Sequence, residues 1–472
     1  MLAFQGEAEA AGAMVVLRAS VLSGRVRDDG FDLAIGGTSR PPSAVAASSM
    51  QLGSMRPPRN TPLASRSRRS GRIGCSPTRP AVSLTDGPAS DGAGSRRGSS
   101  MLIGVPKEVK THEYRVGLVP GNVRELVHHG HKLVVEAGAG TEIGFDDAAY
   151  EAAGASILGS AAEVFGAAEL IVKVKEPQPR ELALLRAGQV LFTYLHLAAD
   201  KALAQGLIRS GAIAVAYETV TDGRGGLPLL APMSEVAGRM AVQVGAHCLE
   251  KEQGGIGVLL GGVPGVPAAK VVILGGGVAG TNAARMAMGM EAYVTVIDKS
   301  LPRLYELDLQ FGAQLHTLFS TMENIEREVV AADLVIGAVL IPGATAPKLV
   351  SRELVRAMKP GAVLVDISID QGGCFETSRP TTHAAPTYIA EGVVHYCVTN
   401  MPGAVARTST VALNNATLPF ALAIADHGWQ RALSEDCHLR DGLNVCRGRV
   451  THPAVARDLE LPLTAPERAL AE

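Results

Sequence analysis

The sequence predicts an α/β fold made of two doubly wound domains, with the second domain inserted into the first. Short apolar runs alternate with helix-like stretches twice, over residues 101–230 and again over 235–400. A long helix-like stretch over 410–427 follows, so we expect the chain to return to the first domain there. This alternation is typical of parallel sheets that are covered by helices on both faces.

Ten apolar runs are predicted to be strands, because strands buried on both faces of a parallel sheet read as continuous apolar segments. They are 102–105, 133–136, 170–174, 190–194, 213–216, 271–274, 293–298, 334–337, 362–366 and 393–398. Between the two series, a helix over 236–251 is expected to begin after Ser234, which is a good N-cap residue.

The composition changes sharply near residue 100. No lysine and no histidine precede Met101, and residues 36–100 are rich in Ser, Gly, Pro and Arg. Such a segment buries too little apolar surface to fold, so we expect disorder. A mis-annotated extension of the reading frame is favoured over a transit peptide, because acidic residues lie where transit peptides avoid them. The predicted division is an extension at 1–100, a substrate domain at 101–230 and 408–472, and a nucleotide-binding domain at 231–407.

Charge and composition exclude several classes of protein. The chain has 44 Lys and Arg against 46 Asp and Glu, so no broad basic field for nucleic acid is expected. No apolar run is long enough to cross a bilayer. The six cysteines are scattered without a CxxC pair. That spacing favours reduced thiols in the cytoplasm and argues against a structural zinc site.

The most informative motif follows the predicted strand at 271–274. Gly275, Gly277 and Gly280 have GxGxxG spacing, a helix-like run over 278–290 follows, and the next predicted strand ends in Asp298. The glycines allow a tight turn, close approach to a pyrophosphate and helix-strand packing. The helix N-terminus offers N–H groups to phosphates, and Asp298 is placed to accept hydrogen bonds from ribose hydroxyls. A glycine-rich packing turn is the weaker alternative. NAD is favoured over NADP because a carboxylate repels a 2′-phosphate.

Charged side chains follow other predicted strands, where doubly wound domains carry their sites. Arg115 has the planar fork that grips a carboxylate, and Lys175 could reach a keto or carboxylate oxygen. By spacing alone, both are more simply explained as surface charges. His196 is a candidate general acid or base. Asp366 ends the predicted strand at 362–366 and Asp370 follows it. Asp366, still within the strand, is the one expected to be structural, which leaves Asp370 near the nicotinamide end of a dinucleotide.

These pieces, in this order, resemble the alanine dehydrogenase family over about residues 101–450. The segments that carry the resemblance are 103–108 (IGVPKE), 115–120 (RVGLVP), 172–177 (VKVKEP), 195–197 (LHL), 259–265 (LLGGVPG), 365–373 (VDISIDQGG), 400–404 (NMPGA) and, more weakly, 442–446 (GLNVC). The resemblance implies two Rossmann-like domains. It also implies reversible, NAD-dependent conversion of L-alanine and water to pyruvate and ammonia.

The resemblance also assigns roles to residues. Arg115 and Lys175 are expected to hold the substrate, His196 to act as general base, and Asp370 to act as a second acid/base group. The glycines of the loop and the family's other NAD-contacting positions form the expected cofactor site. Those other positions are Ser234, Val278, Ala279, Asp298, Arg303, Ser320, Val339, Leu340, Ile367, Ser368, Ile369, Asp370, Val398, Thr399, Asn400 and Met401.

Some family members hold magnesium through a glutamate and a histidine one helical turn apart on the late helix. Here His427 is preceded by Ala423 at that spacing, so no metal site is expected. The family implies a homo-hexamer. Three other interpretations stay open: the NAD-binding subunit of a proton-translocating transhydrogenase, a saccharopine-type dehydrogenase, and a catalytically silent NAD-binding regulator. The intact set of Arg115, Lys175, His196 and Asp370 favours the enzyme.

Overall fold

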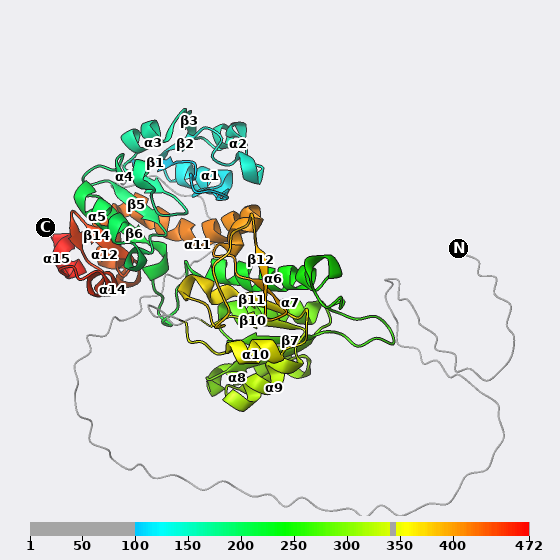
Figure 1. Ribbon diagram of the computed structural model, residues 1–472. Helices are drawn as coiled ribbons and strands as arrows, with labels where there is room; N and C mark the ends of the chain where they lie inside the picture. The colour runs from blue at the N-terminus through cyan, green and yellow to red at the C-terminus, as the bar shows by residue number, and fades with distance from the viewer. Residues whose placement is uncertain (1–99, 340–345, 472) are drawn as a thin grey trace, which may run out of the picture. The chain divides into compact units, whose positions relative to one another are not determined.

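The structure of the protein is a computed structural model that describes residues 100–339 and 346–471 (Figure 1). The predicted N-terminal extension, apart from its last residue, and the predicted cofactor residue Leu340 lie outside these ranges. None of the helices in the described ranges combines the length and apolarity that a bilayer crossing needs.

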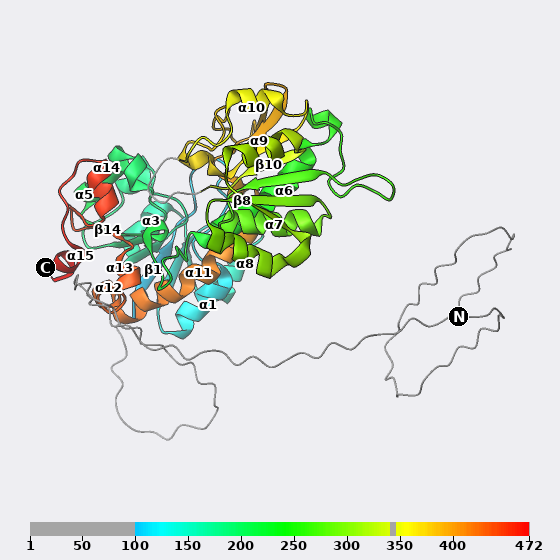
Figure 2. The same ribbon diagram turned by 90° about the horizontal axis from the view of Figure 1, so that it is seen from below.

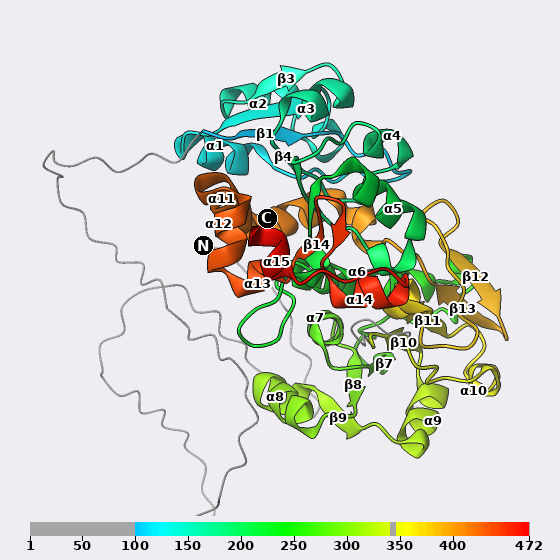
Figure 3. The same cartoon turned by 90° about the vertical axis from the view of Figure 1, so that its left-hand side faces the viewer.

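The first lobe is built on an eight-stranded sheet with the order β15-β14-β6-β5-β4-β1-β2-β3. Strands β1 to β6 are mutually parallel, and β14 pairs antiparallel with β6. Figure 3 shows β3, β1, β4 and β14 of this sheet, in that order from the top of the view downward. The strands are β1 (Leu102–Val105), β2 (Lys132–Glu136), β3 (Ser156–Leu158), β4 (Leu170–Val172), β5 (Val190–Thr193), β6 (Ile213–Ala216), β14 (Leu443–Cys446) and β15 (Arg449–Val450).

The second lobe is built on a seven-stranded sheet with the order β12-β13-β11-β10-β7-β8-β9. All its neighbours are parallel except the pair β12 and β13. The strands are β7 (Lys270–Leu274), β8 (Tyr293–Asp298), β9 (His316–Phe319), β10 (Leu334–Gly337), β11 (Val363–Asp366), β12 (Thr387–Ala390) and β13 (Val393–Tyr396).

Helices cover both faces of each sheet. In the second lobe, α7 and α8 lie on one side and α9 and α10 on the other (Figure 2). In the first lobe, α1, α2, α11 and α12 pack on one face and α3, α5 and α14 on the other. The helices are α1 (Pro120–His128), α2 (Asp147–Ala152), α3 (Ala161–Ala167), α4 (Pro179–Leu182), α5 (Lys201–Ser210), α6 (Ala231–Cys248), α7 (Val278–Gly289), α8 (Leu301–Phe311), α9 (Met322–Ala331), α10 (Arg352–Ala357), α11 (Ala406–His427), α12 (Trp429–Glu435), α13 (Cys437–Arg440), α14 (Pro453–Asp458) and α15 (Pro466–Ala471).

The predicted fold class is confirmed, because two doubly wound α/β units are present. The first sheet takes β1–β6 from before the second lobe in the sequence and β14 and β15 from after it. Helix α11 carries the return, because the fully buried Asn414 binds the start of the first lobe. Its side chain accepts a hydrogen bond from the Val119 backbone N–H at 2.7 Å and donates one to the Val116 carbonyl at 3.2 Å. The exact domain boundaries remain a prediction.

The sequence prediction was wrong in two respects. Ser234 does not cap a helix, because α6 begins at Ala231 with Pro232 in its first turn, where the fixed φ of proline favours helix initiation. Five strands were also missed, namely β3, β9, β12, β14 and β15. Four of these, β3, β9, β12 and β15, include exposed positions and lack a continuous apolar run. The fifth, β14, is buried but contains the polar Asn444.

Candidate active site

The glycine loop between β7 and α7 has the shape that a bound pyrophosphate requires. Gly275 has a φ of +101°, and a Cβ there would lie 2.6 Å from the Ala338 carbonyl oxygen. A Cβ on Gly280 would lie 1.8 Å from the Gly275 carbonyl oxygen, so only glycine allows this packing. No side chain caps the N-terminus of α7, whose first N–H groups are therefore available to an anion.

Asp298 and Arg303 brace this loop. The Asp298 carboxylate accepts backbone hydrogen bonds from Gly276 at 2.7 Å and from Ser300 at 2.8 Å. Arg303 donates through Nε to the Gly276 carbonyl and through Nη2 to the Thr281 hydroxyl, both at 2.7 Å. The predicted ribose-binding acid thus lies beside the phosphate loop, at the end of the neighbouring strand.

The other predicted cofactor residues of the second lobe gather along the same edge of its sheet. Ser320 follows β9, Val339 follows β10, 367–370 follow β11 and 398–401 lie just after β13. The Ser368 hydroxyl donates to the Val339 carbonyl at 2.7 Å, which joins the segments after β10 and β11. Val278 and Ala279 begin α7, and Ser234 lies within α6.

Asp366, the last residue of β11, and Asp370, in the turn after it, have different surroundings. Asp366 is fully buried and accepts hydrogen bonds from the backbone N–H groups of Ser368 and Cys374, both at 3.0 Å, and from the Ser378 hydroxyl. This position matches a structural role. The Asp370 side chain is exposed, yet the protein that surrounds it removes enough water to raise its pKa to about 6. Lys175 and His196, from the first lobe, act on Asp370 in the opposite direction.

In the first lobe, Arg115 is buried rather than a surface charge. It is 2% exposed and lies on the segment between β1 and α1. Its Nε donates to Glu113 Oε1 at 2.6 Å and its Nη2 to Glu113 Oε2 at 2.5 Å. Nη2 also donates to Oδ1 of Asn400 from the second lobe at 3.0 Å, and Nη1 contacts the Met233 sulfur at 3.1 Å. Arg115 thus contacts residues from both lobes.

Two lysines follow β4, and they differ. Lys173 is fully buried and pairs with Glu108 at 3.1 Å and Glu181 at 2.6 Å, so it is not a solvated surface charge. Burial would lower the pKa of Lys173, but the two carboxylates raise it. Glu108 also accepts the backbone N–H of Lys175 at 3.1 Å. The ammonium of Lys175 has no acceptor among the described residues, and burial together with Arg115 lowers its pKa.

His196 begins the short turn after β5 in a left-handed conformation, with a φ of +50°. The Glu218 carboxylate holds this turn, because it accepts the backbone N–H of His196 at 2.5 Å and that of Leu195 at 3.2 Å. The imidazole stacks on Tyr194, with ring centroids 5.8 Å apart, and Nδ1 lies 4.0 Å from Glu218. The ring remains half exposed, which leaves it accessible to a substrate.

The structure therefore brings Arg115, Lys175, His196 and Asp370 to one region where the lobes meet. A cavity of about 230 Å³ in the first lobe is lined by Arg115, Glu113 and Glu108, whereas Lys175, His196 and Asp370 do not line it. Within the described ranges, no three His, Cys, Asp or Glu side chains are arranged to hold a metal ion. The expectation of no metal remains a prediction.

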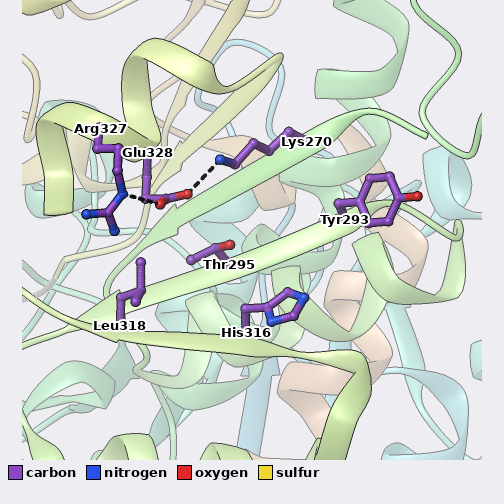
Figure 4. A pocket seen from close by; sticks show the side chains of 7 residues that line it. All are labelled: Lys270, Tyr293, Thr295, His316, Leu318, Arg327 and Glu328. Carbon is purple, nitrogen blue, oxygen red and sulfur yellow. Dashed lines mark hydrogen bonds and ion pairs between the residues drawn. The ribbon is translucent and has the colours of Figure 1, made fainter. Parts of the chain in front are cut away.

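A larger hollow, of about 420 Å³, lies at the opposite edge of the second sheet (Figure 4). Lys270 at the start of β7 and Arg327 on α9 both bind Glu328, at 2.7 and 3.0 Å. Its charges are thus already paired with one another, and none of the predicted site residues lines it. We therefore place the site at the edge that carries the glycine loop.

Sequence reasoning left three residues of this site without their structural role. Glu113 and Glu218 received no role, and Asn400 was assigned to the cofactor, whereas here it contacts Arg115. Glu113 precedes Arg115 by two residues, which in an extended segment places both side chains on one face and was a usable signal. Nothing in the sequence connects Glu218 with His196 or Asn400 with Arg115, because these contacts depend on the tertiary fold.

Comparison with known proteins agrees with this geometry. The family model for the N-terminal domain of alanine dehydrogenase/PNT matches residues 104–237, and the model for the C-terminal domain matches 241–453. The chain is 63% identical to an alanine dehydrogenase of Halomonas elongata over 75% of this chain and 96% of that protein. It is 57% identical to the enzyme of Bacillus subtilis, over 78% and 98%.

Solved structures give the same result. A structure titled L-alanine dehydrogenase superposes with a TM-score of 0.75 at 53% identity, covering 76% of this chain and 99% of that one. A transhydrogenase from Sinorhizobium meliloti gives a TM-score of 0.64 at 26% identity, over 75% and 99%. Both the family models and the relatives span the two lobes. The chain therefore belongs to the alanine dehydrogenase family.

Proposed function

We propose that this protein is an L-alanine dehydrogenase that reversibly converts L-alanine, water and NAD to pyruvate, ammonia and NADH. The observation that carries the proposal is the meeting of three first-lobe groups, Arg115, Lys175 and His196, with Asp370 of the second lobe. They meet at the sheet edge that also bears the glycine loop, so substrate and cofactor sites adjoin.

Membership of the family implies a nicotinamide dinucleotide cofactor, and the residues present fit one. Gly275 and Gly280 let the loop pack closely, and a Cβ on Gly277 would meet nothing within 4 Å, which leaves room for a pyrophosphate at the bare N-terminus of α7. When bound, the nicotinamide would supply the acceptor for the hydride of the substrate Cα, or the donor in the reverse direction. Asp298 beside the loop supports NAD over NADP, because its carboxylate repels a 2′-phosphate.

Arg115 and Lys175 supply the positive charge that holds the substrate carboxylate and carbonyl oxygen. The Lys175 ammonium has no protein acceptor among the described residues, and burial lowers its pKa, so an anionic partner there relieves an unfavourable buried charge. The oxo acid and the amino acid are both small enough for the cavity of about 230 Å³ that Arg115 lines.

His196 and Asp370 move the protons. Hydride leaves the amino acid only when its amine is neutral, so His196 takes a proton from the amine or from the attacking water. Asp370, whose pKa of about 6 lies near neutrality, is suited to exchange protons during imine hydration and ammonia release. Closure of the lobes around the substrate excludes water while hydride moves.

The competing interpretations make different demands on the chain. A transhydrogenase subunit has no use for the set of Arg115, Lys175 and His196, and a silent regulator has no use for a buried ammonium facing an acid. A saccharopine-type enzyme needs room for a larger oxo acid. We further infer a cytoplasmic location from the scattered cysteines and a homo-hexameric assembly from the family resemblance.

The test is the initial rate of NADH formation by the full-length protein with L-alanine and NAD at alkaline pH. We expect a linear increase of absorbance that NADP and D-alanine do not support, and consumption of NADH when pyruvate and ammonia are supplied. Binding of NADH without turnover of any small amino acid would overturn the proposal in favour of a transhydrogenase-like or silent binder.

A further inference from the structure

The guanidinium of Arg115 is almost fully occupied by protein groups. Arginine carries five N–H donors. One from Nε and one from Nη2 bind Glu113, the second from Nη2 binds Asn400, and one from Nη1 contacts the Met233 sulfur. One N–H of Nη1 has no acceptor among the described residues. Arg115 therefore does not present an open bidentate fork to a substrate.

Glu113 is the group that sets this arrangement. It is 5% exposed and binds Arg115 through both carboxylate oxygens. It also accepts the Nδ2–H of Asn400 at 3.1 Å, while Asn400 accepts from Arg115. The three side chains form a closed ring of hydrogen bonds between two first-lobe residues and one second-lobe residue. Any movement that separates the lobes must break it.

We infer that Glu113 is a positioning residue that turns the Nη1 edge of Arg115 toward the substrate carboxylate and, through Asn400, makes that orientation depend on closure of the lobes. This rests on the proposed function. In this arrangement Lys175 is the main electrostatic anchor of the substrate carboxylate, and Arg115 contributes a directed N–H. Glu113 itself touches no reacting atom.

The charge of Glu113 gives it a second effect that a purely steric support would lack. Burial would raise its pKa, but the hydrogen bonds and charge of Arg115 and the charge of Lys175 keep it lowered, so it is ionised. Burial, Arg115 and Lys110 lower the pKa of Lys175, whereas Glu113 and Glu176 raise it. Loss of the Glu113 charge should therefore lower the pKa of Lys175 further.

The main test is Glu113→Gln in the full-length protein, which keeps the shape and removes the charge. We expect the KM for pyruvate to rise by about tenfold to a hundredfold, the cost of weakening a charge-assisted contact. We expect kcat to change by less than about threefold and NADH affinity to stay the same, because the reacting groups are untouched. Glu151→Gln, an exposed glutamate on α2, is the matched control.

The pH profile separates positioning from mere structural support. In Glu113→Gln, the pH above which pyruvate affinity is lost should move to a lower value, because Lys175 loses its proton earlier. An unchanged KM, or an unchanged profile with kcat and NADH affinity falling together, would overturn the inference. Absence of turnover in the unmodified protein would instead refute the proposed function, so the two failures are distinguishable.

Asn400→Ala provides an independent test if Glu113→Gln does not fold. It breaks the ring from the second lobe, and we expect a smaller rise in the KM for pyruvate, of about threefold to tenfold. Because both residues act through Arg115, the double variant should show less than the sum of the two free-energy changes. Strict additivity would overturn the ring as a unit.

Discussion

The two lobes share the order of their first five strands but have different surfaces where that order reverses. In each, the first strand lies between the second and the fourth, β1 in one sheet and β7 in the other. After β7 the chain turns within Gly275–Gly277 and presents backbone N–H groups. After β1 it runs through residues 106–119 before α1 and presents Glu113 and Arg115.

The comparison shows that topology supplies a crevice and that the connecting segment determines what the crevice binds. Backbone N–H groups at a helix N-terminus suit phosphates, because they bind the anionic oxygens without the help of a side chain. Buried side chains suit a small carboxylate, whose position must be fixed relative to one carbon atom. We therefore expect substitutions in the first lobe to affect substrate binding and chemistry, and those in the second-lobe glycine loop to affect cofactor binding. This is the division of labour between the lobes.

His196→Ala should have the largest effect. The residue lies at the end of β5 in the first lobe, and the glycine loop is in the second. Loss of a general base is expected to lower kcat by about a thousandfold while NADH affinity is retained. Single-turnover kinetics and NADH fluorescence titration measure the two quantities. His247→Ala, at an exposed histidine of α6, is the control, and equal loss of both quantities would show that His196 is structural.

A pair of glycine substitutions should separate the lobes. A Cβ on Gly280 would lie 1.8 Å from the Gly275 carbonyl oxygen, and one on Gly117 would lie 2.3 Å from the Val172 carbonyl oxygen. Gly280→Ala should therefore weaken NADH binding by at least about tenfold, because a misplaced loop loses contacts worth that much. Gly117→Ala should instead raise the KM for pyruvate, since this segment carries Arg115.

The control for Gly280→Ala lies on the same helix. Gly289 is exposed, and a Cβ there would meet nothing within 4 Å. Gly289→Ala should leave both constants unchanged and increase stability slightly, by up to about 1 kcal/mol, because alanine is the better helix former. If both Gly280→Ala and Gly117→Ala altered the same constant, the division of labour would be wrong.

The sequence predicted the second lobe better than the first for a physical reason. The phosphate loop is a local structure, so glycine spacing and one strand-helix pair are enough to identify it. The first-lobe site depends on contacts between distant segments, such as the hydrogen bond from Arg115 to Asn400, 285 residues away. Local patterns also failed at Ser234, because Pro232 and not Ser234 marks the start of α6.

Glu218→Gln tests whether the first-lobe site depends on such a distant contact. The Glu218 carboxylate accepts both backbone N–H groups that hold His196 in its left-handed conformation. An amide retains one acceptor oxygen but loses the charge, so we expect kcat to fall by about tenfold. NADH affinity should not change. Glu252→Gln, at an exposed glutamate after α6, is the control, and unchanged kcat would show that the turn holds itself.

The smallest expected effect is that of Asp370→Asn on stability, and its size depends on pH. The folded-state pKa of Asp370 is about 6, above the ordinary 3.8, so the folded protein binds this proton more tightly than the unfolded chain. The contribution of Asp370 to stability is thus greatest below pH 4, declines as pH rises toward 6, and is lost above it. Asn carries no such charge, so the variant should be more stable than the parent above pH 6.

The expected gain is modest, because Asp370 retains contact with solvent and is attracted by Lys175 and His196. We expect Tm to rise by about 1–2 °C at pH 8 and to match the parent below pH 4. Asp308→Asn, at an exposed aspartate of α8, should show no such pH dependence. If Tm had the same pH dependence in both variants, Asp370 would be an ordinary surface acid. The second lobe would then contribute the cofactor site but no charge to the substrate site.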